Sequence, residues 1–134
     1  MINIGIVGSR KWNNKKKVEK VVDLCITKYG KENICIISGG AIGADFLGKE
    51  VALEKGLKYK EYNPAHEHWN EYSEKPKEWY RKPYNVRNYF ERNTFIVEDS
   101  DFLFAFIPLN HISNGTNDTV SKMKKLNKPL SIIN

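Results

Sequence analysis

A chain of 134 residues, 40% of them hydrophobic, is long enough to bury a core of its own, so we expect one domain over residues 1–134. The two cysteines, Cys25 and Cys35, form neither a disulfide framework nor a metal-binding pattern, which favours a reduced, cytoplasmic protein. The formal net charge of +6 is compatible with an anionic partner, and no apolar run approaches the roughly 20 residues that a membrane span needs.

The first half of the chain alternates short apolar runs with stripes of helical period. This pattern predicts a strand at 2–7, a helix at 14–29, a strand at 34–38, a helix at 43–55 and a strand at 58–62. Gly30 and Gly56 follow the two helices, at the position where glycine commonly ends a helix. In the second helix we expect large apolar side chains to be buried, namely Phe46, Leu47, Val51 and Leu53 or their neighbours.

Residues 63–84 interrupt this alternation. The segment carries three prolines, two of the three tryptophans and many charges, and it follows no regular period. After it, the pattern predicts a helix at 85–98, a strand at 102–107, a helix at 116–126 and a strand at 130–133. Strands that alternate with helices indicate an α/β fold with a mostly parallel sheet. We expect a Rossmann-like three-layer sandwich with five strands in the order 3-2-1-4-5 and an irregular, aromatic-rich insertion after the third strand.

Two of the predicted strands end in glycine-rich loops. The first strand runs into Gly8-Ser9-Arg10, and the second runs into Ser38-Gly39-Gly40, with Gly43 and Asp45 at the start of the next helix. Glycine lets a backbone approach a ligand closely, and free N–H groups at a helix N-terminus attract anions. In the expected strand order, ligands bind at the crevice between the first and fourth strands. We therefore expect both loops and the segment after the fourth strand to converge on a phosphate-bearing ligand.

The order of several short motifs resembles the SLOG superfamily. The motifs are Gly8-Ser9-Arg10, Ser38-Gly39-Gly40, Gly43-Ala44-Asp45, Pro64-Ala65, Arg92-Asn93, Asp101 before an apolar strand, and Gly115-Thr116. They span almost the whole chain, in an order similar to that of the YspA-like branch. The resemblance implies a Rossmann-like fold and a site for nucleotides or nucleotide-derived signals, including NAD-derived and ADP-ribose-type molecules. The superfamily also contains LOG-type phosphoribohydrolases and the DNA-binding DprA branch, so the fold alone leaves the function open.

The loops and the resemblance together define a set of expected ligand-binding residues. This set is Gly8, Ser9, Arg10, Ser38, Gly39, Gly40, Gly43, Asp45, Arg92, Asn93, Asn114, Gly115 and Thr116. We expect Arg10 and Arg92 to contact the anion, because a guanidinium can grip a phosphate with two N–H groups.

Other members of this set have a structural alternative that the sequence leaves open. The glycines of the second loop permit either a tight turn or the close approach of a phosphate. Asp45 would either favour the helix dipole as a first-turn carboxylate or bind a ribose hydroxyl. Ser9 would cap the first helix or donate to phosphate, Asn93 would fix a loop or contact a sugar, and Thr116 would cap the fourth helix or donate to an anion.

The resemblance leaves catalysis open. A LOG-type hydrolase needs a carboxylate to stabilise the developing ribosyl cation, but the glutamate position of its motif falls here on Thr119. Asp118 lies one residue earlier, turned by roughly 100° around the helix. We therefore expect a protein that binds a nucleotide-derived small molecule, as a sensor or by sequestering it. The alternative is an N-glycoside hydrolase of a nucleoside monophosphate or NAD-like substrate, with Asp118, Glu91 or Asp45 as its carboxylate.

Further expectations concern partners and metals. His66, His68 and His111 lack the spacing of a metal site, so we expect no metal ion and no other cofactor. The resemblance implies a homodimer or higher homo-oligomer, because SLOG-type domains often pair through their helices. No motif for reading nucleic acid accompanies the lysine-rich helices, so neither nucleic acid nor a membrane is an expected partner.

The insertion at 63–84 follows the carboxyl end of a predicted strand, on the side where ligands bind. Long irregular segments in compact domains are usually functional lids or disordered linkers, and the aromatic content argues against disorder. We expect a lid in which Trp69, Tyr72 or Trp79 contacts the ligand or a partner subunit. The alternative is that these rings only pack against the domain.

Overall fold

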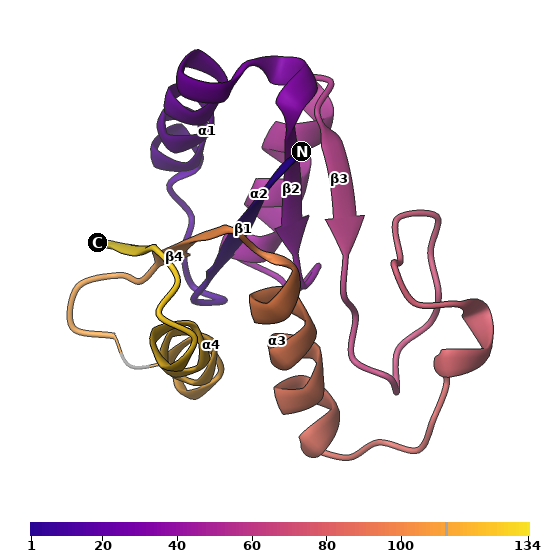
Figure 1. Ribbon diagram of the computed structural model, residues 1–134. Coiled ribbons are helices and arrows are strands. Elements are labelled where there is room, and N and C mark those ends of the chain that lie inside the picture. Colours follow the sequence, from indigo (N-terminus) through magenta and orange to yellow (C-terminus); the bar gives the residue numbers. More distant parts are fainter. Residues whose placement is uncertain (112) are drawn as a thin grey trace.

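The computed structural model describes residues 1–111 and 113–134, which build one five-stranded sheet with helices on both faces (Figure 1). The strands are β1 (Ile2–Gly8), β2 (Ile34–Ser38), β3 (Lys58–Glu61), β4 (Phe102–Phe106) and β5 (Leu130–Ile133). The helices are α1 (Lys15–Tyr29), α2 (Ala44–Glu54), α3 (Arg87–Asp99) and α4 (Asn114–Lys125), with 3-10 turns at Lys31–Asn33 and Lys77–Trp79. Neighbouring strands pair in parallel in the order β3-β2-β1-β4-β5, which confirms the predicted fold class and strand order.

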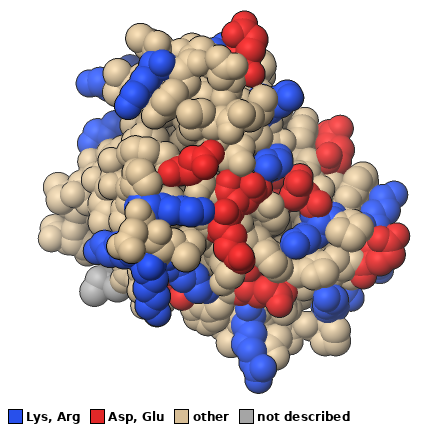
Figure 2. Space-filling model, in the orientation of Figure 1, with Lys and Arg blue, Asp and Glu red and all other residues tan. Residues whose placement is uncertain are grey.

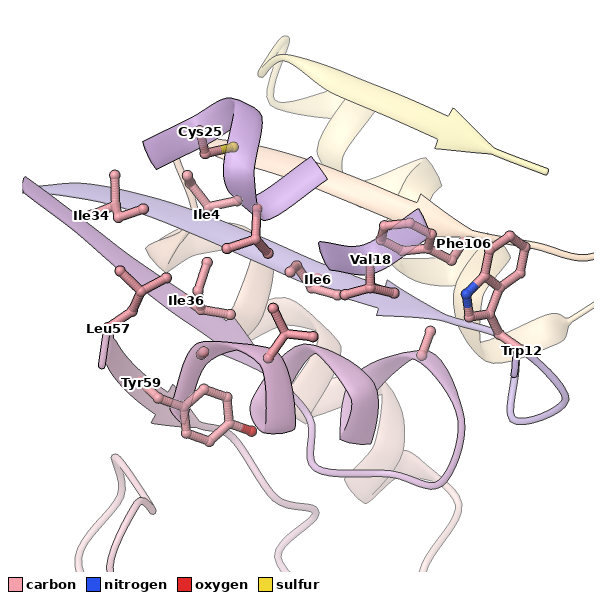
Figure 3. Packing of buried hydrophobic residues seen from close by; sticks show 14 residues of the cluster. Ile4, Ile6, Trp12, Val18, Cys25, Ile34, Ile36, Leu57, Tyr59 and Phe106 are labelled. Carbon is pink, nitrogen blue, oxygen red and sulfur yellow. The ribbon is translucent and has the colours of Figure 1, made fainter. Parts of the chain in front are cut away.

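The alternating side chains of the strands supply a separate core on each face of the sheet. On one face, Ile4 and Ile6 of β1 pack with Ile36 of β2 against α1 and α2 (Figure 3). On the other face, Val7 and Leu103 pack against α3 and α4. Because both faces are covered, the central strands are nearly continuous apolar runs, as is usual in parallel sheets. The carboxyl ends of the strands remain as the edge at which loops from distant parts of the chain meet.

Helix α2 turns a different face to the core from the one that its hydrophobic pattern predicts. Phe46 and Leu53 are 49% and 41% exposed, whereas Gly48 and Val51 are buried. A Cβ on Gly48 would lie 2.8 Å from Cγ2 of Ile6, so the helix packs too closely on β1 for a large side chain there. The prediction that Phe46 and Leu53 are buried is therefore wrong, because small residues make the contact with the sheet.

The insertion after β3 is fastened to the sheet edge by Glu61. The Glu61 N–H donates to the carbonyl of Tyr72 at 3.0 Å, and the Glu61 carboxylate accepts from the amides of Asn63 (2.7 Å) and Asn70 (2.6 Å). Burial opposes ionisation of this carboxylate, but the two amides and Lys49 hold the pKa of Glu61 below its usual value. In Figure 1 the segment extends beyond β3 and then returns to the start of α3.

Cys25 and Cys35 are free, buried thiols whose pKa values are raised by burial, so both behave as small core residues. No helix among the described residues is long and apolar enough to cross a membrane. Within residues 1–111 and 113–134, no group of three His, Cys, Asp or Glu side chains is placed to hold a metal ion.

Candidate functional site

A cavity of about 260 Å³ opens at the carboxyl end of β1, between α3 and the start of α4. Its wall combines the end of β1 and the following loop, the loop before α2, one face of α3 and the first turns of α4. Of the residues predicted for the site, the wall brings together Gly8, Arg10, Asp45, Arg92, Asn93, Asn114, Gly115 and Thr116. The cavity lies where the strand order reverses, which is the usual ligand position in open parallel sheets.

The loop after β1 is held against the start of α2 and the end of β4 by backbone hydrogen bonds. The Ser9 N–H donates to the carbonyl of Phe106 at 3.0 Å, and the Ala44 N–H donates to the carbonyl of Ser9 at 3.2 Å. The Ser9 hydroxyl accepts from the N–H of Lys11 at 3.1 Å, whereas the side chain of Asn14 caps α1. Of the two roles left open for Ser9, helix capping is therefore wrong.

The glycine-rich loop after β2 holds a carboxylate of the protein itself. The Gly39 N–H donates to Oδ2 of Asp45 at 3.1 Å, and Asp45 is only 6% exposed. Burial raises the pKa of Asp45 to about 6, and Arg92 and nearby backbone N–H groups oppose this rise. Those N–H groups belong to Gly39, Ala41 and Gly8. The Gly39 N–H, which such a loop would offer to an external anion, is therefore engaged by Asp45.

Arg92 lies on α3 with 7% of its surface exposed, and its guanidinium reaches the same loop. Nη1 donates to the carbonyl of Gly39 at 2.9 Å and to that of Tyr62 at 3.4 Å, and Nε donates to Oδ1 of Asn93 at 3.0 Å. A Cβ on Gly39 would overlap Nη1 of Arg92, so only glycine leaves room for this contact. The position of Arg92 in the pocket wall therefore depends on Gly39.

Asn93 ties α3 to α4. Its Nδ2 donates to the backbone of α4 at 3.3 Å and to Oδ2 of Asp118 at 3.2 Å, and Asp118 also pairs with Lys122 at 2.8 Å. Asp118 lies outside the pocket wall, whereas Thr119 is part of it. Among the described residues that form the wall, Asp45 supplies the one carboxylate. A hydrolytic mechanism in this pocket would therefore depend on Asp45 rather than on Asp118.

The first turn of α4 forms another side of the pocket. The Ser113 hydroxyl accepts from the N–H of Thr116 at 3.3 Å and donates to its Oγ1 at 2.9 Å. Ser113 is therefore the cap, and the capping role left open for Thr116 is wrong because α4 begins two residues earlier than predicted. Asn114 and Gly115 lie exposed at the pocket, where first-turn N–H groups lack helical partners and favour an anion.

Some predicted site residues support the pocket from behind. The residues outside the wall are Ser9, Ser38, Gly39, Gly40 and Gly43. The Ser38 hydroxyl lies 2.6 Å from that of Tyr59, donates to the carbonyl of Asp45 at 3.1 Å and accepts from the Gly40 N–H at 3.3 Å. These contacts shape the loop around Asp45. Direct contact between these residues and a ligand stays a prediction.

The predicted lid aromatics also lie outside the pocket wall. Tyr72 packs on Tyr59, with 5.6 Å between ring centroids, and Trp79 packs on Phe95 at 5.7 Å. Trp69 is 39% exposed on the insertion. The insertion thus packs its rings against β3 and α3, and a ligand contact by these three residues stays a prediction.

Three residues at the start of α3, Val86, Tyr89 and Phe90, line the pocket and were missed by the sequence analysis. Tyr89 lies three positions before Arg92, so both side chains share one helix face, and this spacing is the signal that could have identified it. The guanidinium carbon of Arg10 lies 5.8 Å from the centre of the Tyr89 ring, and that of Arg92 lies 5.9 Å away. The pocket therefore combines an aromatic ring with two cations.

Charge is distributed unevenly around the molecule. Lys and Arg outnumber Asp and Glu by 22 to 16. On the face shown in Figure 2, the basic side chains are scattered around a central run of acidic ones. Among the residues described on that face, there is no continuous basic stripe of the kind that a long nucleic acid would follow.

Comparisons with known proteins place these observations in context. Residues 36–134 match the model of the circularly permutated YpsA SLOG family, and residues 1–60 match that of DNA recombination-mediator protein A. No curated protein matches the chain significantly.

Solved structures share the fold. DNA processing protein A from Helicobacter pylori is 19% identical with a TM-score of 0.71, over 98% of this chain and 64% of that one. DprA from Streptococcus pneumoniae is 17% identical with a TM-score of 0.61, over 98% and 58%. The molybdenum cofactor binding protein from Rippkaea orientalis is 16% identical with a TM-score of 0.70, over 98% and 75%. This chain thus spans less than two thirds of either DNA processing protein, and the likeness shows the fold alone.

These similarities correct one expectation. The Helicobacter pylori protein has a single-stranded DNA binding mode, and residues 1–60 match the family of DNA recombination-mediator protein A. Nucleic acid was not an expected partner because the sequence carries no motif for reading it. Single strands are also bound by cationic grooves with aromatic stacking surfaces, which need no such motif. Setting nucleic acid aside as a partner was therefore wrong.

Proposed function

Because this chain belongs to the circularly permutated YpsA SLOG family, we propose that it binds a nucleotide-derived small molecule in the pocket at the end of β1. The family match confirms the SLOG resemblance of the motifs. The observation that carries the proposal is the meeting of Arg10, Arg92 and the first turn of α4 around one cavity. Guanidinium groups and first-turn N–H groups both favour a phosphate. NAD-derived and ADP-ribose-type molecules are the proposed ligand class, and the protein would sense or sequester them.

Arg10 is the residue of the wall that is most available to an external anion. Its side chain is exposed, whereas Arg92 is buried and already donates to Gly39 and Asn93. Within the described residues, Arg10 takes part in no salt bridge. Its removal would therefore eliminate a charge-assisted contact with the ligand without breaking an ion pair of the protein.

Calorimetric titration with AMP, ADP-ribose and NAD tests this proposal. The unmodified protein should bind at least one of them. Arg10→Ala should weaken that binding by roughly 10- to 150-fold, the equivalent of about 1.5–3 kcal/mol for a hydrogen bond to a charged group. Lys11→Ala is the matched control, because Lys11 is an exposed neighbouring cation outside the pocket wall. An equal loss in both variants, or no binding of any of the three compounds, would contradict the proposal.

The same samples distinguish binding from hydrolysis. A bound nucleotide recovered intact after incubation supports a binding protein. Release of free base that Asp45→Asn abolishes would instead support an N-glycoside hydrolase, because Asp45 is the carboxylate of the pocket wall. Asp118→Asn is the control, since Asp118 lies outside the wall and pairs with Lys122.

Single-stranded nucleic acid is the second candidate partner. The match of residues 1–60 to DNA recombination-mediator protein A favours it, and the net charge of +6 suits a polyanion. Fluorescence anisotropy with a labelled oligodeoxythymidylate at several salt concentrations tests it. Binding should weaken steeply with salt, with a logarithmic slope of about −0.7 per contacted phosphate. No binding at low ionic strength would exclude this candidate.

A further inference from the structure

Three aromatic rings meet where the insertion joins α3. The ring centroids of His66 and Tyr84 are 4.8 Å apart, those of His66 and Tyr89 are 5.0 Å apart, and those of Tyr84 and Tyr89 are 6.2 Å apart. Asn88 orients the imidazole, since its Nδ2 lies 3.1 Å from Nδ1 of His66. The rings come from the start of the insertion, from its end and from α3. Packing of His66 and Tyr84 on Tyr89 holds its ring in place beside the pocket.

This aromatic cluster, formed by His66, Tyr84 and Tyr89, belongs to neither core of the sheet. Tyr84 is 69% exposed, and Phe90 next to Tyr89 is 39% exposed. Tyr89 and Phe90 both line the cavity. Aromatic surface that is left exposed beside a cavity with convergent polar groups is characteristic of a ligand site rather than of core packing.

Two cations lie near the ring of Tyr89. The guanidinium carbons of Arg10 and Arg92 lie 5.8 Å and 5.9 Å from the ring centre. Arg10 is exposed and makes no salt bridge within the described residues, so its guanidinium can leave the ring. Planar bases stack on tyrosine rings and on guanidinium planes alike.

We infer that the pocket recognises one nucleotide unit, with its base stacked on Tyr89 and its phosphate held by Arg10 and the first turn of α4. The inference rests on the proposed function, which concerns the phosphate, and adds that the pocket also recognises the base. A cavity of about 260 Å³ lies just below the roughly 300–1,000 Å³ of typical small-molecule sites. It therefore takes a single unit, and the remainder of a dinucleotide or of a DNA strand lies outside.

Titrations of the full chain with AMP and ribose 5-phosphate separate the base from the phosphate. The unmodified protein should bind AMP about 5- to 150-fold more tightly, the equivalent of about 1–3 kcal/mol for stacking one base. Tyr89→Leu should remove this preference and leave the affinity for ribose 5-phosphate unchanged, whereas Tyr89→Phe should retain the preference. Trp69→Leu is the matched control, because Trp69 is an exposed aromatic outside the wall.

Three results would overturn the inference while the proposed function stands. They are equal affinity for AMP and ribose 5-phosphate, unchanged AMP affinity in Tyr89→Leu, and loss of ribose 5-phosphate binding in Tyr89→Leu, which would make Tyr89 a structural support. Failure of AMP, ribose 5-phosphate, ADP-ribose and NAD to bind at all would instead refute the proposed function.

Titration with a labelled deoxyadenylate oligomer tests whether the nucleotide that binds in the pocket is free or part of a single DNA strand. Displacement of the oligomer by AMP, with the same sensitivity to Tyr89→Leu, would support the inference and place the unit within single-stranded DNA. AMP binding without oligomer binding would support it with a free nucleotide as the source. If the oligomer binds and neither AMP nor Tyr89→Leu changes that binding, the oligomer does not occupy the pocket at Tyr89. This result would overturn the inference that the pocket takes a nucleotide of a DNA strand.

Discussion

Replacing Asp45 by Asn should make the stability of the protein less dependent on pH in the mildly acidic range. Asp45 is 6% exposed, and burial raises its pKa from 3.8 to about 6. The folded protein therefore binds this proton more tightly than the unfolded chain does. The contribution of Asp45 to stability is full below pH 3.8 and is lost as the pH rises through about 6. At roughly 1.36 kcal/mol per pKa unit, the loss amounts to about 3 kcal/mol.

Urea unfolding of both proteins at pH values from about 3.5 to 7.5 measures this effect. The free energy of unfolding of the unmodified protein, minus that of Asp45→Asn, should fall by about 3 kcal/mol over this range. Glu61 and Asp99, whose pKa values are lowered, change stability in the opposite direction, but they are present in both proteins and cancel in the difference. Glu32→Gln, at an exposed site that makes no salt bridge within the described residues, controls for the change in net charge.

A pH-independent offset between the two proteins is expected, because the amide that replaces the carboxylate would make its own contacts with the Gly39 N–H and with Arg92. Only the change with pH of the difference between the two free energies of unfolding reports the protonation of Asp45. A difference that is constant with pH, or that rises with pH, would refute the argument that the burial of Asp45 outweighs its electrostatic attraction to Arg92.

Four further substitutions, at the site, at the base of the insertion and at the start of α1, are tested by urea unfolding. Gly39→Ala should lower the free energy of unfolding by about 1–3 kcal/mol, because the added Cβ overlaps Arg92. Gly115→Ala is the control and should be neutral or slightly stabilising, because no atom lies within 4 Å of a Cβ added there. Glu61→Gln should lower it by about 2–4 kcal/mol at neutral pH, and by less in acid, because a carboxylate with a lowered pKa loses its stabilising effect as the pH falls. Asn14→Ala should lower it by about 1 kcal/mol through loss of the α1 cap. Equal stability of the two alanine variants at glycine, or no loss in Glu61→Gln, would contradict the contacts described.

The fold is largely predictable from the sequence because local signals agree with one another. β2 and β5 have their predicted bounds, and α1 begins directly after Asn14, whose side chain caps it. The alternation of strands and helices predicts parallel pairing, and the right-handed crossover rule limits the orders that such a sheet can adopt. The face of α2 is not predictable in the same way. A hydrophobic pattern ranks Phe46 above Gly48, but the distance between helix and strand, which decides the packing, is a property of the folded molecule.

The site is predictable in position but not in the role of each residue. Its loops converge as expected, because the carboxyl ends of parallel strands meet at one edge. The hydrogen bond between Gly39 and Asp45, which lie six positions apart, depends on the conformation of the loop, and a sequence motif does not specify that conformation. Trp69, Tyr72 and Trp79 stood out by size and composition, whereas Tyr89 enters the pocket by its helical spacing from Arg92. Composition identifies the aromatic-rich insertion, but only the folded structure shows that Tyr89 lies beside Arg10 and Arg92.

The position of Asp45 also determines where a ligand phosphate can be held. In a strand–glycine–helix loop, an external anion would normally take the backbone donors, but here the Gly39 N–H donates to an internal carboxylate that Arg92 attracts. Arg10 and the first turn of α4 are the donors of the pocket wall that remain for a ligand phosphate. Because Arg10 also lies over Tyr89, the anion site and the aromatic ring are neighbours. The internal carboxylate at the second loop therefore favours the proposed arrangement, in which Arg10 and α4 hold the phosphate and the base stacks on Tyr89.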